Sequence, residues 1–134
     1  MKVFLDVNIF IYAAGREHPY KAPSARFIHE LGEGRVEAVT DAEVLQEVLY
    51  RYWRVKALPE GSALCERIVQ LVPEVLAVSK RDVVIATRLL GEQPTIEPRD
   101  AVHAAVMLNH GITQLYSYDR HFDAIPHLKR LEPS

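Results

Sequence analysis

The chain has 134 residues, of which 49% are hydrophobic and 25% are charged, and its net charge at pH 7 is −2. This composition is that of a globular protein, and it excludes intrinsic disorder and collagen-like repeats. The apolar runs are too short to cross a membrane, the first residues carry no secretory signal because Asp6 interrupts them, and the single cysteine, Cys65, excludes a disulfide framework. We therefore expect one domain over residues 1–134, a cytoplasmic location and no membrane contact.

The hydrophobic pattern predicts strands that alternate with helices along the chain. Short apolar or alternating runs predict strands at 2–6, 35–40, 74–78 and 114–118, with an edge strand near 128–131. Apolar residues at helical spacing predict helices at 21–31, 41–56, 60–72, 80–90 and 98–110. This order is typical of an α/β fold with a mainly parallel sheet, in which functional sites form at the carboxyl ends of the strands.

Acidic side chains recur where those strand ends are expected. Asp6 ends the first strand, Asp119 follows the fourth strand, and Asp100 lies in the first turn of the last helix. Each has an ordinary explanation as a helix cap, a turn residue or a charge that complements the helix dipole. Together they would repel one another strongly at one sheet edge, and bound Mg²⁺ or Mn²⁺ would remove that conflict, because both ions prefer carboxylate and water oxygens.

The helix expected at 41–56 carries two glutamates, and its pattern does not choose between them as site residues. Thr40 and Glu43 have the spacing of a capping box, which gives Glu43 a structural role. Glu47 lies one turn later and away from the apolar stripe, where a solvated glutamate near Arg51 is the ordinary interpretation.

An acidic cleft that holds a metal ion suits phosphodiester hydrolysis, because the ion activates water and neutralises charge at the phosphate. The chain has no histidine pair with zinc-protease spacing, no glycine-rich phosphate loop and no Gly-x-Ser-x-Gly motif. An aspartate-nucleophile phosphatase is an alternative, but it needs a second carboxylate where this chain has Asn8. A receiver domain is a third alternative, but it would need a pair of acids after the first strand, and this chain lacks that pair. A further alternative, outside the enzymes, is a non-catalytic module that binds RNA or protein without cutting it.

Four segments taken together resemble the PIN-domain ribonucleases, and their order and spacing are most similar to the VapC-type toxins of toxin–antitoxin pairs. These segments are Phe4–Ile9, Thr40–Leu49, Arg99–Ala105 and Tyr118–Phe122. The resemblance covers essentially the whole chain. It implies a single PIN domain with a three-layer α/β/α sandwich, Mg²⁺- or Mn²⁺-dependent endoribonuclease activity on RNA, and a cognate VapB-like antitoxin. We also expect a homodimer.

The resemblance also implies roles for individual residues. The family's catalytic acids correspond to Asp6, Glu47, Asp100 and Asp119, and this match favours Glu47 over Glu43. Metal binding is expected at Asp6, Asp100 and Asp119. Supporting positions correspond to Asn8, Thr40 and Asp123, and RNA contacts are expected from Arg51, Arg99 and Arg120.

Overall fold

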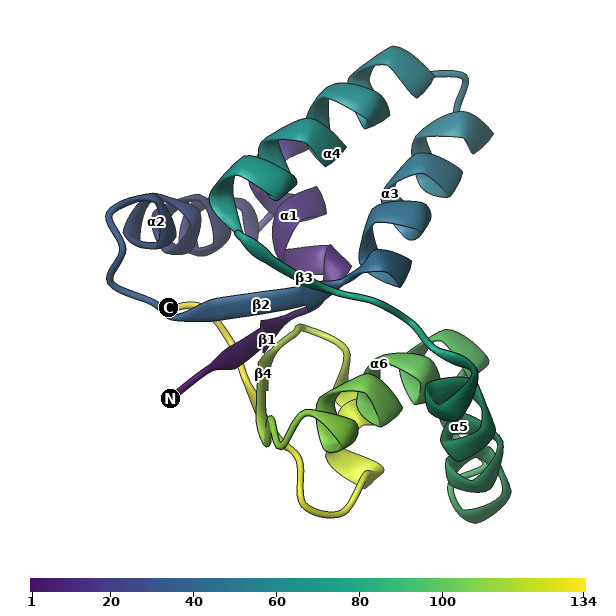
Figure 1. Ribbon diagram of the computed structural model, residues 1–134. Coiled ribbons are helices and arrows are strands. Elements are labelled where there is room, and N and C mark those ends of the chain that lie inside the picture. Colours follow the sequence, from purple (N-terminus) through teal and green to yellow (C-terminus); the bar gives the residue numbers. More distant parts are fainter.

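A five-stranded parallel sheet lies between two layers of helices in the computed structural model, which describes residues 1–134 (Figure 1). The strands run in the spatial order β3-β2-β1-β4-β5, and every neighbouring pair is parallel. They are β1 (Val3–Leu5), β2 (Ala38–Asp41), β3 (Glu74–Leu76), β4 (Gln114–Tyr116) and β5 (Lys129–Leu131). All five predicted strands are confirmed, and so is the parallel α/β architecture.

The helices divide between the two faces of the sheet, as Figure 1 shows. One face carries α1 (Val7–Ala14), α2 (Lys21–Gly32), α3 (Ala42–Arg54) and α4 (Leu58–Leu71), and the other carries α5 (Lys80–Glu92) and α6 (Pro98–Asn109). A short 3₁₀ helix, η1 (Arg120–Ala124), follows β4. None of these helices combines the length and the apolar character needed to cross a membrane.

The core lies on both faces of the sheet, and one part of it forms where the sheet meets α6. Phe4, Val39 and Leu115 on the sheet are completely buried. Ala101 and Ala104 of α6 are also completely buried, and their small side chains let this helix pack closely against the strands. Because α6 lies close to the sheet, its first turn, which contains Asp100, lies near the strand ends.

One helix was not predicted, and one local prediction was wrong. The sequence pattern did not predict α1, because Val7–Ala14 is almost uniformly apolar and shows no helical period directly after a strand. The Thr40–Glu43 capping box does not form either. Instead β2 extends through Asp41, whose side chain caps α3 by accepting a hydrogen bond from the Val44 amide at 3.0 Å.

The strand order reverses at β1, which lies in the middle of the sheet. The chain adds β2 and β3 on one side of β1, and then β4 and β5 on the other. In open parallel sheets this reversal leaves a crevice at the carboxyl ends of the central strands. Asp6 follows β1 and Asp119 lies just beyond β4, so the topology brings these two carboxylates to the same crevice.

Candidate functional site

The four acids expected to form the site all line one small cavity at this crevice. This acidic cavity has a volume of about 240 Å³, and its lining includes Asp6, Glu47, Asp100 and Asp119. Asn8, Arg51 and Arg99 line it as well. The structure therefore brings together, in three dimensions, residues that lie more than a hundred positions apart in the sequence.

Asp6 is held in place by hydrogen bonds from three directions. Its Oδ1 accepts from the Val7 amide at 2.8 Å and thereby caps α1, while its Oδ2 accepts from the Ser117 hydroxyl at 2.6 Å and from the Asn8 amide at 3.4 Å. Asn8 in turn accepts from the Tyr118 amide at 3.2 Å. Burial raises the pKa of Asp6 above its ordinary value. Asn8 and Ser117 therefore fix the orientation of this carboxylate.

Asp100 and Asp119 face each other across the cavity. Asp100 is buried, and its Oδ2 has no hydrogen-bond partner. Burial, together with the neighbouring Asp119 and Asp6 carboxylates, raises the pKa of Asp100 to about 8. Asp119 caps η1 by accepting a hydrogen bond from the His121 amide at 2.9 Å. Asp100, Asp119 and His121 each offer a ligand atom, and these atoms lie within 4.8 Å of one another.

Glu47 is buried, so its interpretation as a solvated glutamate was wrong. Its Oε2 accepts from Nη2 and Nε of Arg51 at 2.7 and 3.0 Å, and its Oε1 lies 3.2 Å from Nε of Arg99. Burial by itself would raise the pKa of Glu47, but His103, Arg51 and Arg99 together lower it. Glu47 is therefore ionised at neutral pH.

His103 is a site residue that the sequence analysis missed. Its side chain is completely buried, with Nδ1 2.8 Å from Asp41 Oδ2 and Nε2 about 4 Å from carboxylate oxygens of Asp6 and Glu47. Burial would lower its pKa, but these carboxylates raise the pKa of His103 to about 10. The imidazole is therefore a buried cation. Its position one helical turn after Asp100 was the available signal, but its partner Asp41 lies 62 residues away.

Three of the expected residues lie outside the acidic cavity. Thr40 is buried and donates a hydrogen bond to the Leu5 carbonyl at 2.8 Å, so it joins β2 to β1. Asp123 is exposed and pairs with Arg130 at 3.0 Å. Arg120 is exposed at the start of η1. Thr40 thus holds together the two strands that lead into the site, whereas Asp123 and Arg120 lie outside the cavity lining.

The donor set of the acidic cavity fits a hard divalent cation. Asp6, Asp100 and Asp119 supply carboxylate oxygens, and the buried Asp100 Oδ2 lacks any protein partner. Glu47 is already paired with two arginines, and the raised pKa of His103 disfavours the neutral imidazole that a metal would need. Asp6, Glu47 and His103 form a second group whose potential ligand atoms lie within 4.8 Å of one another, so the acidic cavity as a whole has the chemistry of a metal site.

Comparison with known proteins identifies the family of this chain. The PIN domain family matches residues 3–128. Ribonuclease VapC13 of Mycobacterium tuberculosis is 40% identical over 129 residues, which cover 96% of this chain and 98% of that protein. Ribonuclease VapC23 of the same species is 34% identical over 118 residues, covering 87% and 92%. The chain belongs to the PIN-domain family, and within it to the VapC ribonucleases of toxin–antitoxin systems.

Solved structures share the same fold at lower sequence identity. VapBC2 from Rickettsia felis, bound to a DNA fragment from its promoter, superposes with a TM-score of 0.78 at 19% identity over the full length of both chains. VapC20 of Mycobacterium tuberculosis, a toxin that cleaves the sarcin–ricin loop, gives a TM-score of 0.74 at 20% identity and covers 91% of this chain and 93% of its own. These matches confirm the PIN-like arrangement of sheet and helices.

Proposed function

We propose that this chain is a metal-dependent endoribonuclease that acts as the toxin of a toxin–antitoxin pair. Its family membership supports RNA as the substrate, and the acid set makes a nuclease a better match than the phosphatase or the non-catalytic module. One observation carries the proposal: three aspartates converge on a small polar cavity in which a buried oxygen of Asp100 has no protein partner.

Asp6, Asp100 and Asp119 would hold Mg²⁺ or Mn²⁺, directly or through water. When bound, the ion lowers the pKa of a coordinated water and offsets the negative charge that develops at the phosphate. The protein keeps the aspartates in position. Ser117 and Asn8 donate hydrogen bonds to Asp6, and the His121 amide donates to Asp119.

Glu47 would orient the attacking water by accepting a hydrogen bond from it. The lowered pKa of Glu47, to which His103, Arg51 and Arg99 contribute, keeps its carboxylate ionised for this role. Attack in line with the leaving 3′ oxygen gives a 5′-phosphate product. Arg51 and Arg99 face the same cavity and can bind the flanking phosphates, with Arg120 as a further contact at the rim.

A VapB-like antitoxin is the partner that we propose for this chain. VapBC2 from Rickettsia felis and a toxin–antitoxin complex from Klebsiella pneumoniae share its fold. Tyr50 and Trp53, near the end of α3, expose 43% and 62% of their surfaces, and exposed aromatic residues of this kind are enriched in protein interfaces. We also propose that the toxin forms a homodimer.

The test of the catalytic proposal is cleavage of single-stranded oligoribonucleotides by the purified chain. We expect cleavage with Mg²⁺ or Mn²⁺, none in chelator, recovery when the ion is restored, and 5′-phosphate ends on the products. Asp6→Asn is the matched control and should be inactive. Undiminished cleavage in chelator, or by Asp6→Asn, would contradict the metal mechanism.

A further inference from the structure

A second, larger cavity opens directly beside the acidic cavity. It has a volume of about 670 Å³ and shares Asn8, Arg51 and Asp119 with the acidic cavity. The rest of its lining includes Tyr12 of α1, His18 of the loop between α1 and α2, and Tyr118 after β4. We call it the aromatic cavity. A linear polymer that places its reacting group among the aspartates of the acidic cavity can extend into the aromatic cavity.

The aromatic rings around this cavity form one packed cluster. Tyr20 and Tyr118 are stacked in parallel, with ring centroids 4.0 Å apart and an interplanar angle of 4°. Tyr12 stands edge-on to both rings, at 5.3 and 5.5 Å. His18 lies 4.5 Å from Tyr12 and is the exposed member of the cluster. The cluster therefore presents Tyr12, His18 and Tyr118 to the open cavity.

Hydrogen bonds hold two of these rings in fixed orientations. The Tyr118 and Ser24 hydroxyls share a hydrogen bond of 2.7 Å, and Ser24 is completely buried. The Tyr20 amide donates to Nδ1 of His18 at 3.1 Å, which places the proton of a neutral His18 ring on Nε2. A ligand that stacks here would meet rings that are already ordered, so little conformational entropy would be lost on binding.

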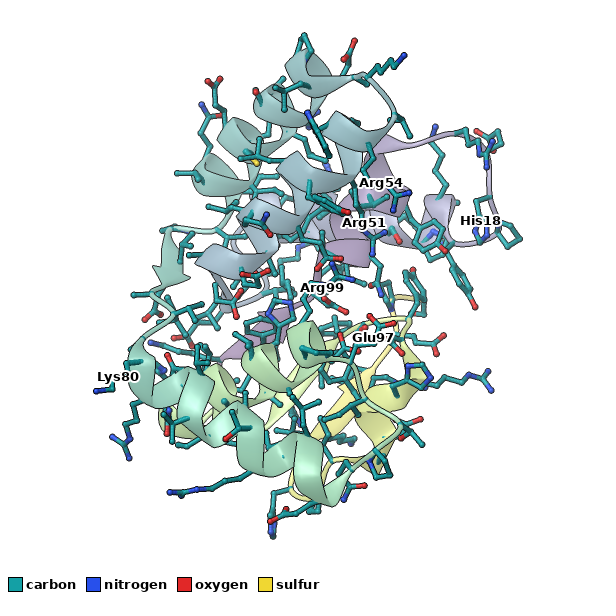
Figure 2. All side chains as sticks on the ribbon, turned by 90° about the vertical axis from the view of Figure 1, so that its right-hand side faces the viewer. His18, Arg51, Arg54, Lys80, Glu97 and Arg99 are labelled. Carbon is teal, nitrogen blue, oxygen red and sulfur yellow. The ribbon has the colours of Figure 1, made fainter.

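Two arginine side chains line the aromatic cavity together with the rings. Arg16 lines the aromatic cavity and is exposed, and it forms no ion pair within the chain. Arg51 lies at the boundary with the acidic cavity, where 46% of its side chain is exposed. Figure 2 shows Arg51 on α3 and Arg99 on α6 near the centre of this face, with His18 farther out on the loop beyond α1.

We propose that the aromatic cavity is a nucleotide subsite for the RNA strand on one side of the scissile phosphate. A base stacks on the rings of Tyr12 and His18, and the neighbouring phosphate binds Arg16. Aromatic rings beside cationic side chains are how proteins bind single-stranded nucleic acid, and stacking tolerates every base. An apolar protein segment fits less well, because Asn8, Arg16, Arg51 and Asp119 make much of the lining polar. This inference rests on the proposed function.

Binding of a fluorescent single-stranded RNA tests the subsite separately from cleavage. The probe is an oligoribonucleotide that carries 2-aminopurine, titrated in chelator so that it is not cut. Stacking contributes about 1–3 kcal/mol per base, so Tyr12→Ala should weaken binding at least about 5-fold and reduce the fluorescence quenching. Tyr12→Phe keeps the ring and should bind like the wild type. Val69→Ala changes an exposed apolar residue of α4 outside both cavities and is the matched control.

His18→Ala changes an exposed residue, and it provides the same test if Tyr12→Ala does not fold. Wild-type affinity and quenching in both alanine variants would overturn the subsite. The subsite is also overturned if these variants weaken binding of the co-expressed antitoxin but not of RNA, because the surface would then be a protein interface. If the wild type binds the probe through these rings but never cuts RNA with Mg²⁺ or Mn²⁺, the proposed function fails and the subsite remains.

Discussion

Nδ1 of His103 lies 2.8 Å from Oδ2 of Asp41, and neither side chain has any exposure to solvent. This buried pair joins the cap of α3, at the end of β2, to the middle of α6. Glu47 lies on the first of these helices and Asp100 on the second, so the pair sets the distance between two of the acids in the cavity.

Breaking this pair should destabilise the protein strongly. Asp41→Asn keeps a good helix cap, because asparagine caps as well as aspartate, but it leaves the His103 cation without its closest partner. Removal of one member of a buried ion pair typically costs about 3–5 kcal/mol, and we expect a loss of that order in urea unfolding. His103→Gln is the second single variant, and with the double variant it completes a thermodynamic cycle. A coupling energy near zero would show that the two side chains act independently.

Stability without metal should fall as pH rises. The pKa of Asp100 is raised from 3.8 to about 8 and that of His103 from 6.5 to about 10, so the folded state binds more protons than the unfolded state. Each group contributes its full stabilisation at pH values below its pKa in the unfolded chain. That stabilisation is lost as the pH rises toward the folded-state pKa, about 8 for Asp100 and about 10 for His103. Unfolding in chelator across this range should show the decline.

The variant Asp100→Asn distinguishes the contribution of Asp100 to this pH dependence from that of His103. Asparagine has no charge to lose, so this variant should be more stable than the wild type in chelator at pH 8, by at least about 1 kcal/mol, because one pKa unit corresponds to about 1.4 kcal/mol. The variant should also gain much less melting temperature than the wild type when Mn²⁺ is added. Equal gains in the two proteins would mean that Asp100 is not a metal ligand.

The two glutamates of α3 should behave differently. Glu47→Gln leaves two arginines without their carboxylate partner in the cavity and should lose most of the cleavage activity while still folding. Glu43→Gln should change stability by no more than about 0.5 kcal/mol, because Asp41 and not Glu43 forms the cap of this helix. Cleavage assays and urea unfolding on both variants check this. If Glu43→Gln lost activity and Glu47→Gln did not, Glu43 and not Glu47 would be the catalytic glutamate.

Gly61 should resist replacement although it lies inside a helix. A Cβ at this position of α4 would lie 2.6 Å from Cβ of Tyr52 on α3, so Gly61→Ala should destabilise the protein by about 1–3 kcal/mol despite the better helix propensity of alanine. Gly91 lies in α5 with no atom within 4 Å of such a Cβ. Gly91→Ala is therefore the matched control, and it should be neutral or stabilising in thermal unfolding.

Local sequence patterns were sufficient for the five strands and for the helices from α2 onward. Pro98 lies at the first turn of α6 and Gly111 just past its end with a positive φ of 67°, and residues of these types act on the backbone next to them. The convergence of Asp6, Asp100 and Asp119 was also predictable, since strand ends of a parallel sheet meet at one edge. Their catalytic and metal-binding roles stay predictions.

The errors at Glu47 and His103 have a different origin, which is contact between distant segments. Glu47 is polar and lies off the apolar stripe of α3, yet it is buried because Arg99 of α6 covers it. His103 lies in a helix rich in alanine, and its charge depends on Asp41 at the end of β2. No period or spacing within one segment contains this information.

The arrangement of arginines around the two cavities has a consequence for how the protein responds to ionic strength. The chain has a net charge of −2, and Arg16, Arg51 and Arg99 are the arginines that line the two cavities. Each phosphate neutralised on a single strand releases about 0.7 of a counterion, so three contacts give a slope of about −2 in log affinity against log salt. Such a protein would bind RNA non-specifically only with low affinity at any salt concentration. Its choice among cellular RNAs would therefore depend on the few nucleotides that fit the cavities.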